Sequence, residues 1–355
     1  MTDTESVLIA PGAHDSSGHT EPTAARRVLT STAFLIALVV AALVILFSVI
    51  SPDGAFLSSM NFRNLALDST QAILIAVGMT LLVGAGQLDL SVGANIILSS
   101  VVSAEVITSL GGTPEQVLAG DYPHLTFAVI MGILAALATG LVFGLVNATL
   151  VNLLKMSSFI VTLAMMSVGT GVAYIISDGI NTSSLPREMQ QNFGSADVLG
   201  SIPIPTIIAV VVGIIGWFVL TRLKFGTHSL GMGSSITAAE RAGINVARTR
   251  LKLFGAMGLI AGLVGFIEIS RFLTTNIQGH TGDALAAIAA VVIGGTSLFG
   301  GRASVPGAVV AAMIPAVLVN GLVIMRVGSF YQLVVTGVIL LVAVGIDQRR
   351  RAHQR

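Results

Sequence analysis

Long stretches without a charged residue constrain the fold of this chain more than any other feature of its sequence. Eight stretches of 18 residues or more contain no Asp, Glu, Lys or Arg, and two further apolar stretches, 90–110 and 253–273, are each interrupted by one acid. A membrane-spanning helix needs about 20 apolar residues, so the sequence predicts an all-α polytopic membrane protein with about ten transmembrane helices. The uncharged stretches are 28–52, 69–88, 122–154, 156–177, 198–221, 284–301, 303–325 and 327–346.

Composition agrees with a membrane protein and divides the chain into three parts. Charged residues make up 10% of the sequence, against about 25% in an ordinary soluble domain. We expect a membrane domain over 28–348, preceded by a disordered cytoplasmic tail, 1–27, and followed by a basic cytoplasmic tail, 349–355. The chain contains no cysteine, which excludes disulfides and thiolate chemistry. The glycine-rich stretch 284–301 and the stretch 90–110 are also compatible with re-entrant segments.

The distribution of Lys and Arg tests the number of spans. With ten spans and the N-terminus inside, 14 of the 18 basic residues fall on the inner side and only Arg63, Arg187, Arg271 and Arg326 on the outer side. Lys and Arg are retained on the cytoplasmic side during insertion, so this asymmetry favours ten spans with both termini in the cytoplasm. Helices five positions apart then run in opposite directions, and spans 2–5 and 7–10 are candidates for inverted repeats, as in many transporters.

The loop 222–252 carries six of the 18 basic residues, which marks it as a cytoplasmic loop. A short helix is predicted inside it. Ser234, Ser235 or Thr237 can cap the N-terminus, the spacing of Thr237 and Glu240 fits a capping box, and Gly243 can end the helix in the left-handed region.

Three alanines, Ala238, Ala239 and Ala242, fall on one small-residue face of this predicted helix, whereas Glu240 and Arg241 point elsewhere. Such a smooth face on the cytoplasmic side can enter a groove on another protein. A helical linker lying among the lipid headgroups is an equally simple interpretation of the same spacing.

Polar residues inside the apolar stretches are the candidates for chemistry. Asp89 and Ser91 follow the glycines that end the second stretch, where they can cap the next helix or shape a break beside a permeation path. No phosphate-binding GxxxxGK[ST] loop, HExxH or GxSxG motif occurs in the sequence, and the six histidines show no ligand spacing. The other intramembrane polar residues are Asn95, Glu105, Asn147, Asn152, Glu268 and Asn320. Acids inside a span are functional candidates by default, but we expect Glu105 and Glu268 to lie at the outer interface.

Four ordered motifs resemble the permease subunit of bacterial ATP-binding-cassette (ABC) sugar importers of the ribose/xylose/galactose type. They are GMTLLVGAGQLDLSVGA (78–94), GLVNATLVNLLKMSSFIVTLAMMSVGTGVAY (144–174), TAAERAGINVARTRLKLF (237–254) and DALAAIAAVVIGGTSLFGGRASVPGAVVAA (283–312), followed by Asn320-Gly321. The resemblance extends from about residue 34 to Asp347. The chain departs from the family pattern at Gln87, at Ile236-Thr237 and at Ser157-Ser158, which bears on substrate choice and on the ATPase partner.

The resemblance implies a transport subunit of the bacterial cytoplasmic membrane that is not itself an enzyme. It implies ten spans with inverted halves, as in vitamin B12-type importers. A second permease copy, an ATPase subunit that uses ATP and Mg, an extracytoplasmic sugar-binding protein and membrane lipid are the implied partners; no cofactor, metal or nucleic acid is expected on this chain. The helix of the loop would be the coupling helix, with Ser235, Thr237, Ala238, Ala239, Glu240, Arg241, Ala242 and Gly243 at the ATPase. The residues expected to line or shape the path are Asp89, Ser91, Asn95, Asn147 and Asn320.

Two other functions remain as alternatives at this point. A proton-coupled secondary transporter of a small polar solute would use Glu105 or Glu268. An intramembrane enzyme would need a catalytic constellation, and none is recognisable in the sequence. Within a sugar importer, the sequence does not distinguish a pentose, a hexose or a polyol, nor a homodimer from a heterodimer.

Overall fold

The computed structural model describes residues 32–338 except Leu199, Ser201, Ser329, Leu333 and Thr336. Both predicted tails and most of the predicted last span, 327–346, lie outside the described residues. Within them, eight helices are long and apolar enough to cross a membrane, which confirms an all-α polytopic fold. They are α2 (Thr32–Ile50), α3 (Ser59–Gly84), α4 (Val92–Gly111), α6 (Leu125–Leu154), α7 (Ser158–Ile176), α9 (Ile204–Arg222), α12 (Val246–Phe272) and α14 (Val305–Ile324).

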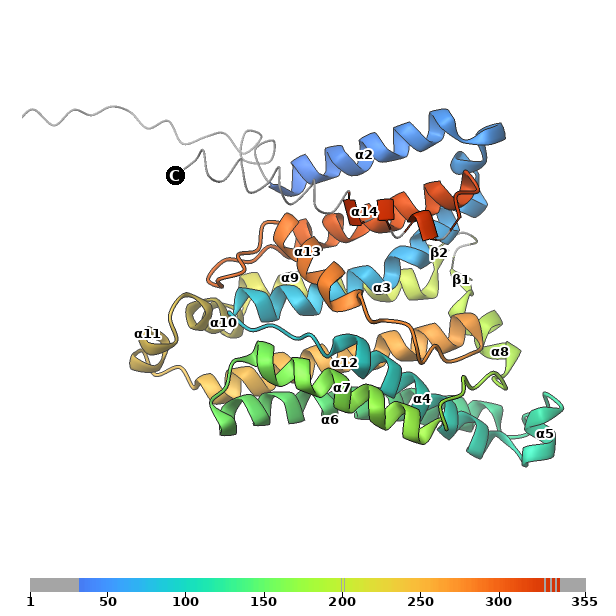
Figure 1. The fold of residues 1–355 in the computed structure, drawn as a ribbon, viewed down its shortest axis with the longest axis horizontal. Helices are drawn as coiled ribbons and strands as arrows, with labels where there is room; N and C mark the ends of the chain where they lie inside the picture. Colours follow the sequence, from blue (N-terminus) through green and yellow to red (C-terminus); the bar gives the residue numbers. More distant parts are fainter. Residues whose placement is uncertain are drawn as a thin grey trace, which may run out of the picture.

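The shorter elements connect these helices at the two ends of the bundle (Figure 1). Two residue pairs, Asp197 with Pro203 and Val198 with Ile202, form a minimal antiparallel ladder between β1 (Asp197–Val198) and β2 (Ile202–Pro203). The loop between α7 and α9 contains α8 followed by one π-helical turn, η2. The remaining elements are η1 (Pro52–Leu57), α5 (Pro114–Leu118), α8 (Arg187–Met189), η2 (Gln190–Gly194), α10 (Lys224–Ser234), α11 (Ile236–Arg241) and α13 (Asp283–Ile293).

Of the two alternatives for 284–301, a full-length spanning helix is not the one observed. Helix α13 has 11 residues, which at about 1.5 Å per residue reach about half of a 30 Å hydrocarbon core. The helix ends at Ile293 because a glycine pair follows, of which Gly295 has φ 98°, a conformation that other residues rarely adopt. An irregular segment, 274–282, precedes α13, so this crossing is discontinuous.

Helices α4 and α13 occupy corresponding positions in two halves of opposite orientation. Both begin near the middle of the bundle after an irregular segment and run to opposite ends, while α3 and α12 cross the whole bundle in opposite directions (Figure 1). The helix contacts also correspond between the two halves: α3 packs against α13 and α14, and α12 packs against α4 and α6. This arrangement agrees with the predicted inverted halves.

Burial separates a protein core from a surface suited to lipid. The apolar windows of α3, α4 and α12 are 72–78% buried, whereas those of α2, α6, α7 and α9 are 11–28% buried. Large apolar side chains are exposed along these outer helices, including Ile45, Leu134 and Ile214. An apolar surface of this extent fits a hydrocarbon environment rather than water.

Glycines bring α6 and α12 into backbone contact. A Cβ added at Gly140 would lie 2.2 Å from the carbonyl oxygen of Gly258, and one added at Gly258 would lie 2.1 Å from that of Gly140. The amide of Asn95 on α4 donates to the same Gly140 carbonyl at 3.2 Å. Glycines spaced four residues apart, Gly140 with Gly144 and Gly258 with Gly262, thus allow tight packing of the two helices within the chain.

The described basic residues gather at one end of the bundle. The loops that join α6 to α7, α9 to α12 and α13 to α14 meet at the end where α10 and α11 lie (Figure 1). These loops and the adjoining ends of α9 and α12 carry Lys155, the six basic residues of 222–252 and Arg302. At the opposite end, Arg63 pairs with Asp197 at 2.9 Å, and Arg271 pairs with Asp68. Ten spans with the N-terminus inside predict this division of the basic residues between the two ends of the bundle.

Candidate translocation and coupling sites

The first break, residues 85–91, joins α3 to α4 through a buried carboxylate. The Oδ1 atom of Asp89 accepts hydrogen bonds from the backbone N–H of Ser91 at 2.9 Å and from its hydroxyl at 2.6 Å. Ser91 in turn accepts from the Nδ2 of Asn147 on α6 at 2.8 Å. Ser91 is the N-cap residue of α4, but its side chain makes no capping bond to the first turn. The acid therefore orders the break rather than capping the helix.

Helix α7 holds the same break from the other side. The hydroxyl of Ser158 accepts from the N–H of Leu88 at 3.0 Å, and that of Thr162 accepts from the N–H of Leu90 at 3.1 Å. Side-chain hydroxyls thus replace the backbone partners that a helix would have supplied. Irregular backbone at membrane depth needs such partners or water, because lipid offers none.

Four of the five predicted path residues, Asp89, Ser91, Asn95 and Asn147, lie together here. All four are at most 2% exposed, so none of them lines an open surface of the chain. They shape the break from within. The Oδ1 of Asn147 has no hydrogen-bond partner among the described residues.

Asn320 lies apart from this cluster. Its Nδ2 donates to the Oδ1 of Asn61 at 2.9 Å, and Asn61 donates to the carbonyl of Phe56 at the opposite end of the bundle from α11. Asn320 thus lies away from the first break, and its assignment to the path stays a prediction. The sequence pattern could not reveal this pairing, because Asn61 and Asn320 are 259 positions apart in the chain.

The second break, residues 274–282, is held by a polar cluster that we call the His280 cluster: Gln71, Glu268, His280 and Asp283. The two ring nitrogens of His280 bind different acids, Nδ1 with Asp283 at 2.8 Å and Nε2 with Glu268 at 2.9 Å. Gln71 on α3 donates to Asp283 at 2.7 Å. The cluster ties α3, α12 and α13 together, and the side chain of its Glu268 is 16% exposed. Glu268 lies one helical turn before Arg271, near the end of α12 that is opposite to α11.

The sequence predicted only one member of this cluster as a candidate. The signal that could have revealed it is the i, i+3 spacing of His280 and Asp283 at the start of an apolar helix. Glu105, the other intramembrane acid, accepts from the hydroxyl of Thr182 at 3.2 Å, in the loop after α7. That position agrees with the expected outer interface.

Helix α11 forms where the loop sequence predicts a helix and lies at the basic end of the bundle (Figure 1). Of the three candidate caps, Ser235 is the one used: its hydroxyl accepts from the N–H of Ala238 at 3.2 Å. The capping box of Thr237 and Glu240 does not form, because Thr237 is already inside the helix. Gly243 follows the helix with φ 81°, as expected.

The predicted alanine face is divided by the structure. Ala239 is 4% exposed and packs against the chain itself, so it cannot contact a partner directly. Its carbonyl accepts from the N–H of Ile244, which folds the residues after α11 back under the helix. The exposed residues of the predicted coupling set are Ser235, Thr237, Ala238, Glu240, Arg241, Ala242 and Gly243.

Four glycines connect α10 to both discontinuous crossings, and we call them the glycine junction: Gly84, Gly233, Gly300 and Gly301. The N–H of Gly301 donates to the carbonyl of Gly84 at 2.9 Å. A Cβ added at Gly233 would lie 2.2 Å from that carbonyl and 2.7 Å from the nitrogen of Gly301. The end of α3, the loop after α13 and the helix leading to α11 are therefore in backbone contact at one point.

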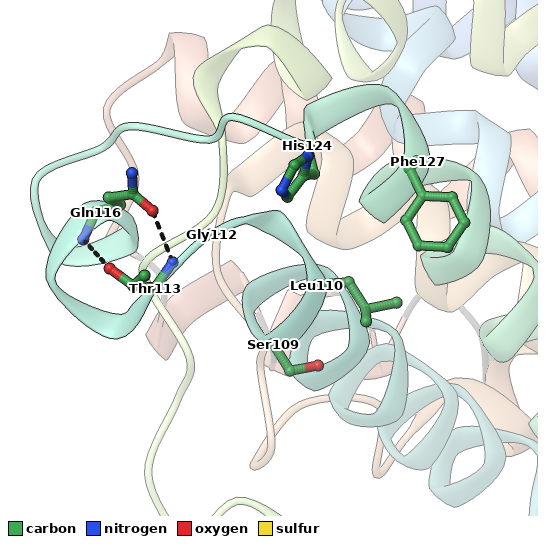
Figure 2. Close-up of a pocket in the computed structure, with 7 residues that line it drawn as sticks. All are labelled: Ser109, Leu110, Gly112, Thr113, Gln116, His124 and Phe127. Carbon is green, nitrogen blue, oxygen red and sulfur yellow. Dashed lines mark hydrogen bonds between the residues drawn. The ribbon is translucent and has the colours of Figure 1, made fainter.

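A shallow hollow lies at the opposite end, between the end of α4, α5 and the start of α6 (Figure 2). Thr113 and Gln116 form a complete capping box on its rim, with bonds of 2.9 and 3.4 Å. None of the predicted site residues lines this hollow, which is formed by Ser109, Leu110, Gly112, Thr113, Gln116, His124 and Phe127.

An all-α bundle with apolar outer helices and two broken crossings defines a multi-pass membrane transport protein. Residues 61–344 match the family described as branched-chain amino acid transport system / permease component, and the chain belongs to this family. No solved structure matches the chain.

Curated relatives extend over most of the chain. The ribose import permease protein RbsC of Bacillus subtilis (strain 168) is 37% identical over 311 residues, covering 87% of this chain and 91% of that protein. The D-allose transport system permease protein AlsC of Escherichia coli (strain K12) is 33% identical over 317 residues, covering 89% and 90%. The xylose transport system permease protein XylH of Haemophilus influenzae (strain ATCC 51907 / DSM 11121 / KW20 / Rd) is 31% identical over 371 residues, covering 88% and 95%.

Proposed function

We propose that this chain is the membrane-spanning subunit of an ABC importer that takes a monosaccharide or a related polyol across the bacterial cytoplasmic membrane. The relatives supply the solute class, since their names describe the transport of ribose, D-allose or xylose. The observation that carries the proposal is α11, a capped and exposed helix at the basic end that joins both broken crossings through the glycine junction.

The energy source lies on another chain in this proposal. The sequence has no GxxxxGK[ST] loop, so a separate ATPase subunit binds ATP and Mg. That subunit receives α11 in a groove. Its contact is made by Ala238 and Ala242, which are small and exposed, with the charged Glu240 and Arg241 beside them.

Movement of α11 reaches the solute path through α10. Because the glycine junction is a set of backbone contacts, a displacement of α10 moves the end of α3 and the loop after α13 without side-chain rearrangement. The first break follows α3 directly in the chain. The second break directly precedes α13. Two such chains enclose the path, and a sugar-binding protein docks at the opposite end.

Substitution of the exposed alanines tests the assignment. Ala238→Glu and Ala242→Glu should abolish co-purification of the ATPase subunit while membrane insertion is retained, because each adds a charged side chain to the contact. Ala119→Glu, an exposed alanine after α5 at the opposite end, is the matched control. Full recovery of the ATPase with both coupling variants would show that α11 is not the contact.

A proton-coupled secondary transporter is the second candidate, and the His280 cluster favours it. Glu268 and Asp283 share one histidine between them, an arrangement that proton relays use. This candidate requires uptake driven by a proton gradient alone, and the loss of that uptake in Glu268→Gln. The importer requires no such uptake.

A further inference from the structure

Arg250 differs from its neighbours at the basic end of the bundle. Five of the six basic residues of 222–252 are exposed, whereas Arg250, at the start of the second turn of α12, is only partly exposed. Its Nη1 donates to the Oδ1 of Asn152 on α6 at 3.2 Å. Its Nε is buried and has no hydrogen-bond partner among the described residues. A guanidinium group carries five N–H donors, and the described residues accept only one of them.

The positive charge of Arg250 is not neutralised by the described part of the chain. The two Arg–carboxylate ion pairs among the described residues lie at the opposite end of the bundle. Glu240 on α11 attracts Arg250 through space, but the two side chains form no ion pair. A charge that is partly withdrawn from water is normally paired. The missing partner is therefore a negative group from outside the described residues.

Asn152 holds the guanidinium group of Arg250 at the seam between α6 and α12. Its Nδ2 donates to the carbonyl of Ala247 at 3.1 Å, while its Oδ1 accepts from Arg250. Because both ends of the amide are engaged, its orientation is fixed. Lys155 follows three positions later, is exposed, and ends α6 in the left-handed region with φ 52°. Residues three apart lie on the same side of a helix, so Lys155 adds a second positive charge on the side that carries Asn152.

Apolar side chains are exposed at the same end of α6. Leu153, Leu154 and Met156 are 73%, 56% and 43% exposed. Arg250 lies one turn from the start of α12, and Asn152 lies two residues from the end of α6, so their contact is close to one end of both spans. At this depth hydrocarbon gives way to lipid headgroups, and anionic lipids place negative charge there. The seam thus offers apolar contacts and positive charge together, as the binding of an anionic phospholipid requires.

We propose that Arg250 and Lys155 bind the headgroup phosphate of an anionic phospholipid at the basic end of the α6–α12 seam. The guanidinium group donates to phosphate oxygens, and the ammonium group of Lys155 adds charge. Asn152 is a positioning residue, because it orients the guanidinium group. The site requires only that the chain lies in a bilayer, so it is independent of the proposed function.

Titration with lipid tests the site. The full-length chain is purified in detergent, delipidated, and titrated with phosphatidylglycerol or with zwitterionic phosphatidylcholine, and bound lipid is counted by native mass spectrometry. We expect phosphatidylglycerol to bind more tightly. Arg250→Gln should weaken its binding about tenfold or more, the effect of losing a charge-assisted hydrogen bond. Equal binding of the two lipids by the unsubstituted chain would overturn the proposal.

Three further variants separate a binding role from a structural one. Lys224→Gln removes an exposed charge at the start of α10 and should weaken binding less than about twofold; a loss equal to that of Arg250→Gln would show that only overall charge matters. Arg250→Lys keeps the charge and should bind more tightly than Arg250→Gln, whereas a purely structural arginine would lose both equally. Asn152→Ala keeps both charges and should weaken binding severalfold. Unfolding midpoints in phosphatidylcholine check that each variant is folded.

Other sources of negative charge give different results. Soluble glycerol phosphate lacks acyl chains and should compete weakly; if it displaces phosphatidylglycerol at the lipid's own concentration, the site binds free phosphate and the lipid assignment is wrong. If Arg250→Gln keeps its lipid binding but loses co-purification of the ATPase subunit, Arg250 contacts that subunit and the proposal is wrong. Neither result decides sugar transport, which ATP-driven uptake measures separately.

Discussion

Gly233→Ala is the substitution that tests how force passes from α11 to the solute path. The added Cβ would lie 2.2 Å from the carbonyl oxygen of Gly84, 2.7 Å from the nitrogen of Gly301 and 3.0 Å from the carbonyl carbon of Ala85. All three atoms belong to the backbone, so none can rotate away, and the junction must open. Overpacking of this kind costs about 1–3 kcal/mol, which changes an equilibrium set by the contact about five- to 150-fold.

The assay is ATP-driven sugar uptake, measured beside co-purification of the ATPase subunit. We expect uptake to fall at least severalfold while the ATPase still binds, because α11 itself is unchanged. Gly231→Ala is the control on the same helix: the nearest atom to its added Cβ is the Cδ1 of Ile244 at 3.7 Å, an ordinary contact. Wild-type uptake by Gly233→Ala, or equal losses in the two variants, would refute transmission through the junction.

Three further substitutions probe separate parts of the structure. Gly258→Ala should lower the free energy of unfolding of the detergent-solubilised protein by about 1–3 kcal/mol, since its Cβ meets the backbone of Gly140 on α6. An unchanged unfolding midpoint would contradict that contact. Ser235→Ala removes the cap of α11 and should cost about 1 kcal/mol of helix stability, seen as weaker ATPase binding, whereas Ser234→Ala should leave binding intact because that hydroxyl bonds within α10. Asp89→Ala should destabilise the first break by about 1–3 kcal/mol, since it leaves the buried hydroxyl and N–H of Ser91 without their acceptor; a fully stable variant with normal uptake would contradict the ordering role.

The sequence predicted the features that depend on local pattern. Apolar stretches located the spans, the spacing around Ser235 and Gly243 located α11, and the count of Lys and Arg separated the two ends. Each of these follows from neighbouring residues along the chain, because hydropathy, capping and the left-handed preference of glycine act within a few residues.

Features that depend on long-range packing were missed or misplaced. Ala239 is buried because the chain after α11 folds beneath it, which helical spacing cannot show. Asn320 pairs with a residue far away in sequence, and the His280 cluster joins three helices through side chains from distant parts of the chain. The sequence could not decide whether 284–301 spans as one helix, because absence of charge reports the environment of a segment and not its regularity.

Transport measured with a single energy source tests the central claim most directly. Proteoliposomes that contain this chain and its ATPase are given the binding protein and a labelled sugar, and the proton gradient is abolished with an ionophore. An importer driven through α11 accumulates sugar when ATP and Mg are present on the ATPase side, and Ala238→Glu abolishes that uptake. Uptake that needs the proton gradient and ignores ATP would contradict the account.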